Sequence, residues 1–122
     1  MFTSARRLFL VTAILATTAR ADEARVTVMS YNVWKGWSQV EDGFRKGIES
    51  IKASGADVIG LQEASPGLAG KIAAELGWFR EDKSTGSAQI VSRYPILESV
   101  AIDRPSGALI RISEKPERRI FL

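Results

Sequence analysis

The stretch Asp57-Val-Ile-Gly-Leu-Gln-Glu63 decides the fold class, because it is a short apolar run that ends in an amide and a carboxylate. Its length and composition predict a strand. An earlier stretch, Val26-Thr-Val-Met-Ser-Tyr-Asn-Val33, is rich in residues that favour strands, and nothing in it breaks one. We therefore expect two short strands, separated by residues 34–56.

A helix is predicted after each strand. The first is indicated by apolar residues at helical spacing, which are Val40, Phe44, Ile48 and Ile51. Ser38-Gln-Val-Glu41 predicts a capping box at its start. Ser65-Pro66 predicts the N-cap and first position of a second helix, which Gly77 ends. The order strand, helix, strand, helix predicts an α/β layered fold whose first two strands are parallel.

The pattern changes after Gly77, where short strand-like pieces are separated by glycine and proline. The pieces are Trp78–Asp82, Ser87–Ser92, Ile96–Ile102 and Ala108–Ser113. They predict an antiparallel meander. Ile120-Phe121-Leu122 indicates the start of one more strand.

Charge and composition exclude several classes of function. Lys and Arg total 17 against 14 Asp and Glu, but three of the basic residues lie within the first 21 positions, where there is no acid. Residues 22–122 are therefore neutral overall, which gives no support for a basic nucleic-acid surface. The chain has no Cys and no His. Disulfides, thiolate nucleophiles, Ser-His-Asp catalysis and histidine-ligated metals are therefore excluded within it.

Residues 1–21 have the layout of a secretory signal peptide. A basic segment, Met1–Arg7, precedes the apolar run Leu8–Ala16, and Ala19-Arg20-Ala21 fits a cleavage site. Arg6-Arg7 resembles a twin-arginine signal. We expect an exported protein, periplasmic or secreted, whose mature domain is 22–122. The alternatives are a buried N-terminal helix and an anchor that retains Leu8–Ala16, although this run is short for the roughly 30 Å core of a bilayer.

Asn32 and Glu63 close the two predicted parallel strands. Ligands of α/β sheets bind at the carboxyl ends of strands, so the two side chains share one edge of the sheet if the strands are neighbours. A carboxylate there suits Mg²⁺ or Mn²⁺, and an amide beside it can orient the carboxylate, a metal-bound water or a phosphate oxygen. The alternative is structural: a solvated or ion-paired Glu63 and a turn-forming Asn32.

Three motifs together resemble the endonuclease/exonuclease/phosphatase superfamily, the DNase I-like proteins. They are Ser30-Tyr31-Asn32, Asp57–Glu63, and Gly86-x-x-x-Ile90-x-Ser92-Arg93-Tyr94-Pro95-Ile96. They follow the order of the family and span residues 26–96.

The resemblance implies a four-layered α/β sandwich and a Mg²⁺-dependent (or Mn²⁺-dependent) phosphoesterase. It makes Glu63 the metal-binding carboxylate and Asn32 the amide that positions phosphate or metal-bound water. These two are the catalytic candidates, and Gln62 and Arg93 receive no catalytic role. The substrate is a phosphoester, in nucleic acid, a phospholipid head group or a sugar phosphate, and no obligate protein partner is expected.

The later motifs of the family, a Thr-His-Leu, an Asp-x-Asn and a closing Ser-Asp-His, are absent from this chain. The chain is therefore expected to be the N-terminal half of such a domain, without its second sheet. It contains no convincing general base for neutral pH, because exposed carboxylates titrate near pH 4. An inactive fragment or a small exported binding module is the alternative function.

Trp34, Lys35 and Trp37 follow Asn32 on a predicted loop. Such a cluster can stack on a nucleobase or lie at a membrane surface. The interpretation we favour is that the tryptophans cover an edge of the core.

Overall fold

The computed structural model describes residues 23–81, 86–101 and 106–122. The predicted leader, residues 1–21, lies outside this part, as do Asp82 and Ile102, the predicted ends of two strands. Within the described ranges, no helix has the length and apolar character needed to cross a bilayer.

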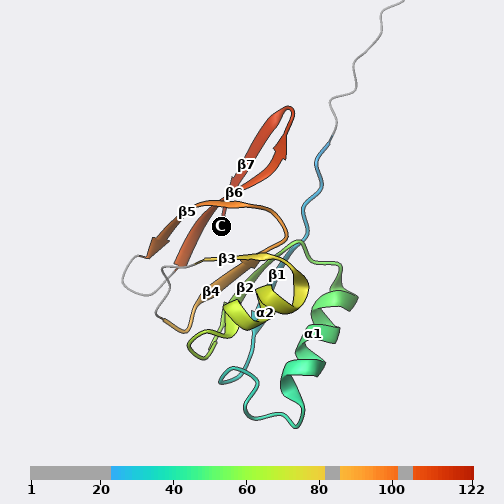
Figure 1. The fold of residues 1–122 in the computed structure, drawn as a ribbon, viewed down its shortest axis with the longest axis vertical. Coiled ribbons are helices and arrows are strands. Elements are labelled where there is room, and N and C mark those ends of the chain that lie inside the picture. The colour runs from blue at the N-terminus through green and yellow to red at the C-terminus, as the bar shows by residue number, and fades with distance from the viewer. Residues whose placement is uncertain (1–22, 82–85, 102–105) are drawn as a thin grey trace, which may run out of the picture.

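A four-stranded sheet is the centre of the fold (Figure 1). Its order is β1-β2-β4-β3, with β1 at Val28–Asn32, β2 at Val58–Gln62, β4 at Gln89–Ser92 and β3 at Phe79–Arg80. The first two strands are parallel, as predicted, and Asn32 is paired with Gln62 in their register. The other two pairs are antiparallel.

A second sheet of three antiparallel strands contains β5 (Ile96–Ala101), β6 (Ser106–Glu114) and β7 (Glu117–Phe121). β7 is the strand indicated by the apolar C-terminus. The predicted absence of a second sheet is wrong, and so is the single meander of all pieces after Gly77, because β3 and β4 join the first sheet. The reason lies in β4: Ile90 and Val91 point to opposite faces and are both buried, which requires a strand inside a layered structure.

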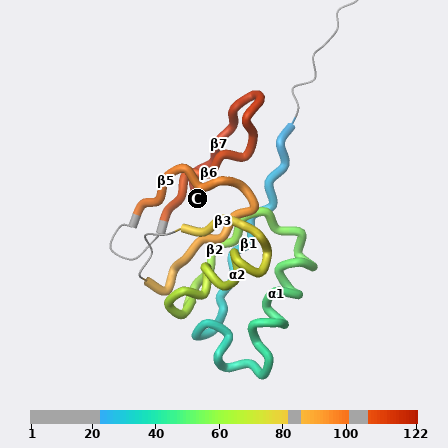
Figure 2. Tube along the Cα trace, viewed as in Figure 1, coloured from blue at the N-terminus to red at the C-terminus, as the bar shows by residue number. Residues whose placement is uncertain are grey.

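The layers are helices, first sheet and second sheet, as Figures 1 and 2 show. Helices α1 (Gly43–Ser54) and α2 (Leu68–Leu76) cover one face of the first sheet, where Ile59 and Val91 belong to the larger core cluster. On the opposite face Val58 packs with Ala108 and Ile110 of β6. The mixed α/β architecture predicted from the sequence is confirmed at this level.

The predicted capping box at Ser38 is wrong. Helix α1 begins at Gly43, and its N-cap is Asp42, which has a left-handed φ of 54° and makes no side-chain cap. The buried Trp37 folds back against Gly43 and Gly47, so the residues before the helix form turns.

Arg45 lies on the outer face of α1 and forms ion pairs with Asp42 and Glu49. The hydrogen bond to Asp42, followed by that to Glu49, raises the pKa of the Arg45 guanidinium. The group therefore stays charged at any pH at which a protein is folded.

The predicted cap of α2 is also wrong. The helix begins at Leu68, after Gly67, and Ser65 makes no side-chain cap. The buried side chain of Gln89, on β4, replaces it: the backbone N–H of Ala69 donates to Gln89 Oε1 at 2.8 Å. Gln89 Nε2 donates in turn to the Ser65 carbonyl at 3.0 Å. A tertiary contact therefore satisfies the first turn of this helix.

Candidate functional site

The carboxyl ends of β1 and β2 bring Asn32 and Glu63 into contact. The backbone pairing continues past the strands, because the Val33 N–H donates to the Gln62 carbonyl at 2.9 Å. At this edge Asn32 Nδ2 donates a hydrogen bond of 2.9 Å to Glu63 Oε1. The two residues that the sequence placed on one edge of the sheet are therefore direct neighbours.

Both sides of the Asn32 amide are used. Its Oδ1 accepts the backbone N–H of Trp34 at 2.9 Å, while its Nδ2 binds Glu63. The two contacts fix which side of the amide faces the carboxylate. Among the described residues, Glu63 Oε2 accepts no hydrogen bond, and both side chains are exposed. One carboxylate oxygen is thus positioned by the amide, and the other is open to solvent or a cation.

Glu63 has a left-handed backbone, with φ 56°. This conformation is uncommon for a residue with a side chain. Contacts on both sides maintain it: the Glu63 carbonyl accepts the Gly36 N–H at 2.8 Å, and the Ala64 N–H donates to the Ser87 carbonyl at 2.8 Å. Backbone strain of this kind concentrates at functional sites.

The loop after Asn32 is a left-handed turn. Trp34, Lys35, Gly36 and Trp37 have φ values of 35°, 54°, 66° and 62°. The Trp37 N–H closes the turn on the Val33 carbonyl. Trp37 is 6% exposed and belongs to the core, whereas Trp34 is 57% exposed. The interpretation that these tryptophans cover the core is therefore correct for Trp37 and wrong for Trp34.

The metal ligands that the side chains at and around Glu63 can offer are hard oxygen atoms, of the type that Mg²⁺ and Mn²⁺ prefer. Gln62 turns its Nε2 to the Gly60 carbonyl at 2.9 Å, and its Oε1 lies 3.4 Å from the Ser30 hydroxyl. In the part of the chain that the structure describes, no three Asp, Glu, His or Cys residues gather to hold a metal. The set fits a cation that keeps most of its water and takes one carboxylate from the protein.

Arg93 lies at the other end of strand β2 from Glu63. Its Nη1 is 3.2 Å from Asp57 Oδ1, and its guanidinium lies 5.4 Å from the ring centre of Trp78. Asp57 comes just before the start of β2, and Glu63 comes just after its end. Arg93 is therefore a charge at a strand end, as the sequence suggested, and is remote from the Asn32–Glu63 pair.

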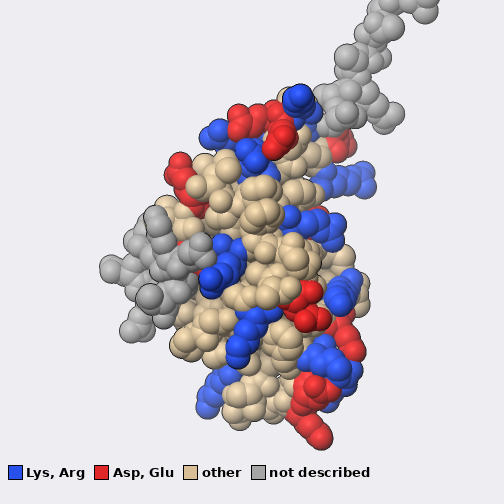
Figure 3. Space-filling model, viewed as in Figure 1, with Lys and Arg blue, Asp and Glu red and all other residues tan. Residues whose placement is uncertain are grey.

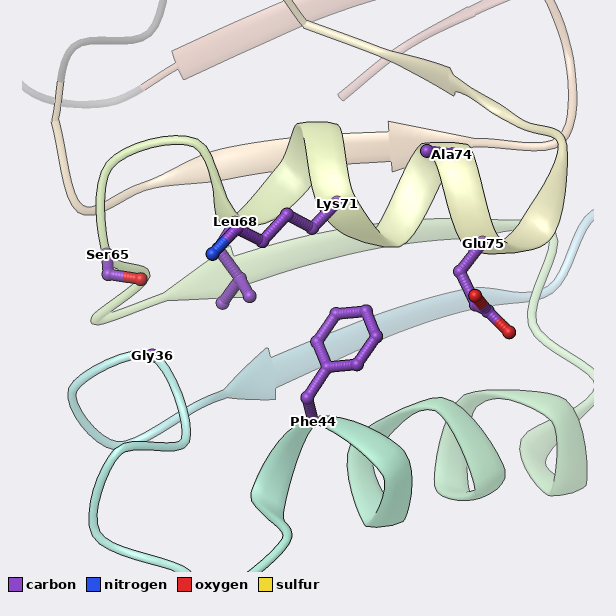
Figure 4. A pocket seen from close by; sticks show the side chains of 7 residues that line it. All are labelled: Gly36, Phe44, Ser65, Leu68, Lys71, Ala74 and Glu75. Carbon is purple, nitrogen blue, oxygen red and sulfur yellow. The ribbon is translucent and has the colours of Figure 1, made fainter.

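A groove that sequence reasoning missed separates the two helices (Figure 4). Its volume is about 620 Å³, and its lining residues are Gly36, Phe44, Ser65, Leu68, Lys71, Ala74 and Glu75. Phe44 extends into it from α1. The spacing of Lys71, Ala74 and Glu75 predicts a shared helix face, but nothing in the sequence shows that the two helices leave space between them.

Charges of both signs are interspersed on the face shown in Figure 3. This distribution agrees with the overall neutrality of residues 22–122. It indicates that any recognition of a phosphoester on this face depends on local contacts.

Comparisons of the chain with protein-family models, with curated proteins and with solved structures find no match. The superfamily resemblance therefore rests on the three sequence motifs, and the site rests on its own geometry.

Proposed function

We propose that this chain provides the metal-binding and phosphate-positioning part of a Mg²⁺-dependent phosphoesterase. The observation that carries the proposal is the 2.9 Å hydrogen bond between Asn32 and Glu63 at the carboxyl ends of two parallel strands. In an α/β sheet, this edge is where ligands bind.

Each residue of the pair has a distinct role. Glu63 supplies a carboxylate oxygen to Mg²⁺ or Mn²⁺, and Asn32 orients that carboxylate without adding charge. The bound metal would neutralise phosphoryl oxygens and lower the pKa of a bound water. Because the Asn32 amide is fixed by the Trp34 N–H, the Glu63 carboxylate needs little reorganisation when the cation binds.

The layer order of helices, first sheet and second sheet supports the further proposal that the chain is part of a four-layered sandwich of the DNase I type. The first sheet contributes the Asn32–Glu63 pair, and one helical layer lies on its outer face. We include export through the leader, residues 1–21, in this proposal.

The test is metal binding and phosphodiester hydrolysis by the full chain. Mn²⁺ binding is measured by calorimetry, and turnover of bis(4-nitrophenyl) phosphate is followed in Mg²⁺ and in EDTA. Glu63→Gln should weaken Mn²⁺ binding about ten-fold or more and remove any Mg²⁺-dependent turnover. Glu98→Gln, an exposed carboxylate on β5, is the matched control and should change neither. Equal Mn²⁺ affinity in the Glu63→Gln variant and the parent chain would reject the proposal.

A binding module without turnover is the second candidate. Two observations favour it: the chain has no His, and among the described residues Glu63 belongs to no group of three Asp, Glu, His or Cys residues that could hold a metal. Phosphoester hydrolysis requires a base for the attacking water as well as a metal. Mn²⁺ binding that depends on Glu63 but is accompanied by no hydrolysis in the same experiment would select this candidate.

A further inference from the structure

Trp34 is the most unusual side chain near the Asn32–Glu63 pair. Its backbone N–H is hydrogen-bonded to Asn32 Oδ1 at 2.9 Å, so its side chain originates directly beside the pair. Trp34 is 57% exposed, although Trp37, three residues later, is almost completely buried. The two tryptophans of one short turn are therefore used in different ways.

Folding alone does not explain an exposed indole at this position. Exposure gives up much of the free energy that burial of an aromatic side chain contributes. Residue 34 is also held at φ 35°, and the next residue at φ 54°, a conformation disfavoured for residues that carry a Cβ. The closing contact from Trp37 to Val33 and the contact from Gly36 to Glu63 maintain the turn. The turn thus presents a planar side chain to solvent on a rigid backbone.

We propose that Trp34 is a stacking platform for the nucleobase of a phosphoester substrate, so that the pair acts on nucleotides or nucleic acid. This inference rests on the proposed function, because the pair supplies the phosphate end of the same ligand. In a nucleotide the base is one sugar ring away from its phosphate. A ligand phosphate at Glu63 and its metal therefore leaves the attached base near residue 34.

A nucleobase fits this surface better than a lipid membrane. Membrane attachment needs several apolar side chains on one surface and is strengthened by positive charge. Here Trp34 is hydrogen-bonded through its backbone to Asn32, which in turn binds the negatively charged Glu63, and Lys35 is the one basic residue of the turn. Stacking on a base needs one fixed aromatic ring and tolerates any base, since every base has a π face.

The experiment measures binding of four probes to the full chain, with and without Mg²⁺: AMP, adenosine, ribose 5-phosphate and a short oligo(dT). AMP should bind about ten-fold more tightly than ribose 5-phosphate, because only AMP stacks. Trp34→Ala should abolish this difference, and Trp34→Phe should restore most of it. Comparison of AMP with oligo(dT) shows whether free nucleotides or strands are preferred.

Phe79→Ala is the matched control, since Phe79 is an exposed aromatic on β3, at the opposite edge of the first sheet from β1. It should leave all four affinities unchanged. Equal affinities of the Trp34→Ala variant and the parent chain for AMP would overturn the inference, as would an absence of AMP binding. Trp34-dependent binding to phosphatidylcholine–phosphatidylglycerol vesicles, without a base effect, would overturn it in favour of a lipid surface.

Failure of the proposed function gives a different result. Trp34-dependent binding of adenosine, which has no phosphate, together with Glu63→Gln having no effect on Mn²⁺ binding, would retain the stacking site and reject the metal site. Mn²⁺ binding that Glu63→Gln weakens, together with adenosine and AMP binding that does not depend on Trp34, would retain the metal site and reject the stacking site.

Discussion

The indole of Trp37 lies against the backbone of Gly47, so that a Cβ atom at residue 47 would fall 2.3 Å from Trp37 Cζ2. No real Cβ makes so short a contact with a buried ring. The ring is also in edge contact with Tyr31 and Phe44, with centroids 5.6 Å and 6.1 Å away. Glycine at position 47 is therefore required by packing, although it weakens α1 as a helix.

Gly47→Ala should destabilise the protein by about 1–3 kcal/mol, because overpacking outweighs the gain of about 1 kcal/mol in helix propensity. Urea denaturation gives the free energy of unfolding. Gly86→Ala, at a glycine where an added Cβ meets nothing closer than 4.0 Å, is the control and should change stability little. A Gly47→Ala variant as stable as the parent chain would show that Trp37 can move away.

The tertiary cap of α2 leads to a second prediction. Gln89→Leu should destabilise the protein by about 2–3 kcal/mol, because it leaves the buried Ala69 N–H without its acceptor and removes one of the two donors to the Ser65 carbonyl. Ser65→Ala should have a much smaller effect, because the Ser65 side chain caps nothing. Thermal and urea unfolding of both variants measure the difference. The opposite order of effects would indicate that Ser65 is the cap in solution, as its sequence position suggested.

Charge at the Asn32–Glu63 contact gives a prediction that depends on pH. Asn32→Asp places a second carboxylate beside Glu63, and the two repel each other when both are ionised. The loss of stability should therefore be about 1 kcal/mol at neutral pH and should shrink in acid, where carboxyl groups are protonated.

Melting temperatures in acid, where carboxyl groups are protonated, and at neutral pH test this prediction, with Asn32→Ala as the uncharged control. The control loses the hydrogen bond to Glu63 without adding a charge, so at pH 7 it should be destabilised less than Asn32→Asp. Mg²⁺ should raise the stability of Asn32→Asp more than that of Asn32→Ala, because only the first variant adds a carboxylate beside Glu63. A pH-independent loss in Asn32→Asp would mean that the two carboxylates do not face each other.

The Asp57–Arg93 ion pair should respond unequally to the removal of its two partners. Asp57 is 8% exposed, and its Oδ2 also accepts the Thr27 N–H at 2.9 Å. Asp57→Ala should destabilise by about 2–3 kcal/mol, because the partly buried Thr27 N–H loses its acceptor and Arg93 loses its counter-ion. Arg93→Ala, which removes an exposed cation and its contact with Trp78, should remove only about 1 kcal/mol. Equal losses, measured by urea denaturation, would contradict this order.

The sequence predicted the parts of the fold that depend on local patterns. The pattern of apolar residues that predicts a strand at Val58–Leu61, or the apolar face of α2, is complete within a few residues of sequence. The rule that parallel strands end at the same edge was sufficient to place Asn32 beside Glu63, and the role of this pair remains a prediction.

The predictions that were wrong share a physical cause: contacts between residues far apart in the sequence replaced the local contacts that the sequence motifs suggested. Gln89 caps a residue 20 positions earlier in the chain, and no local motif indicates this. Trp34 and Lys35 carry no sign of a left-handed backbone, because hydrogen bonds to the carbonyls of Val33 and Glu63 impose it. The division of the strands between two sheets depended on burial of both faces of β4, which its four residues do not reveal by themselves.

The two ends of strand β2 carry different kinds of contact. The Asp57–Arg93 ion pair at its beginning stabilises the fold, while Glu63, after its end, is exposed to solvent. The two positions are about 20 Å apart along an extended strand, far enough for their substitutions to combine additively. Directed evolution can therefore diversify the solvent-facing residues 32, 34, 35 and 63, and stabilising changes around residues 57 and 93 can be introduced in parallel without disturbing the selected activity.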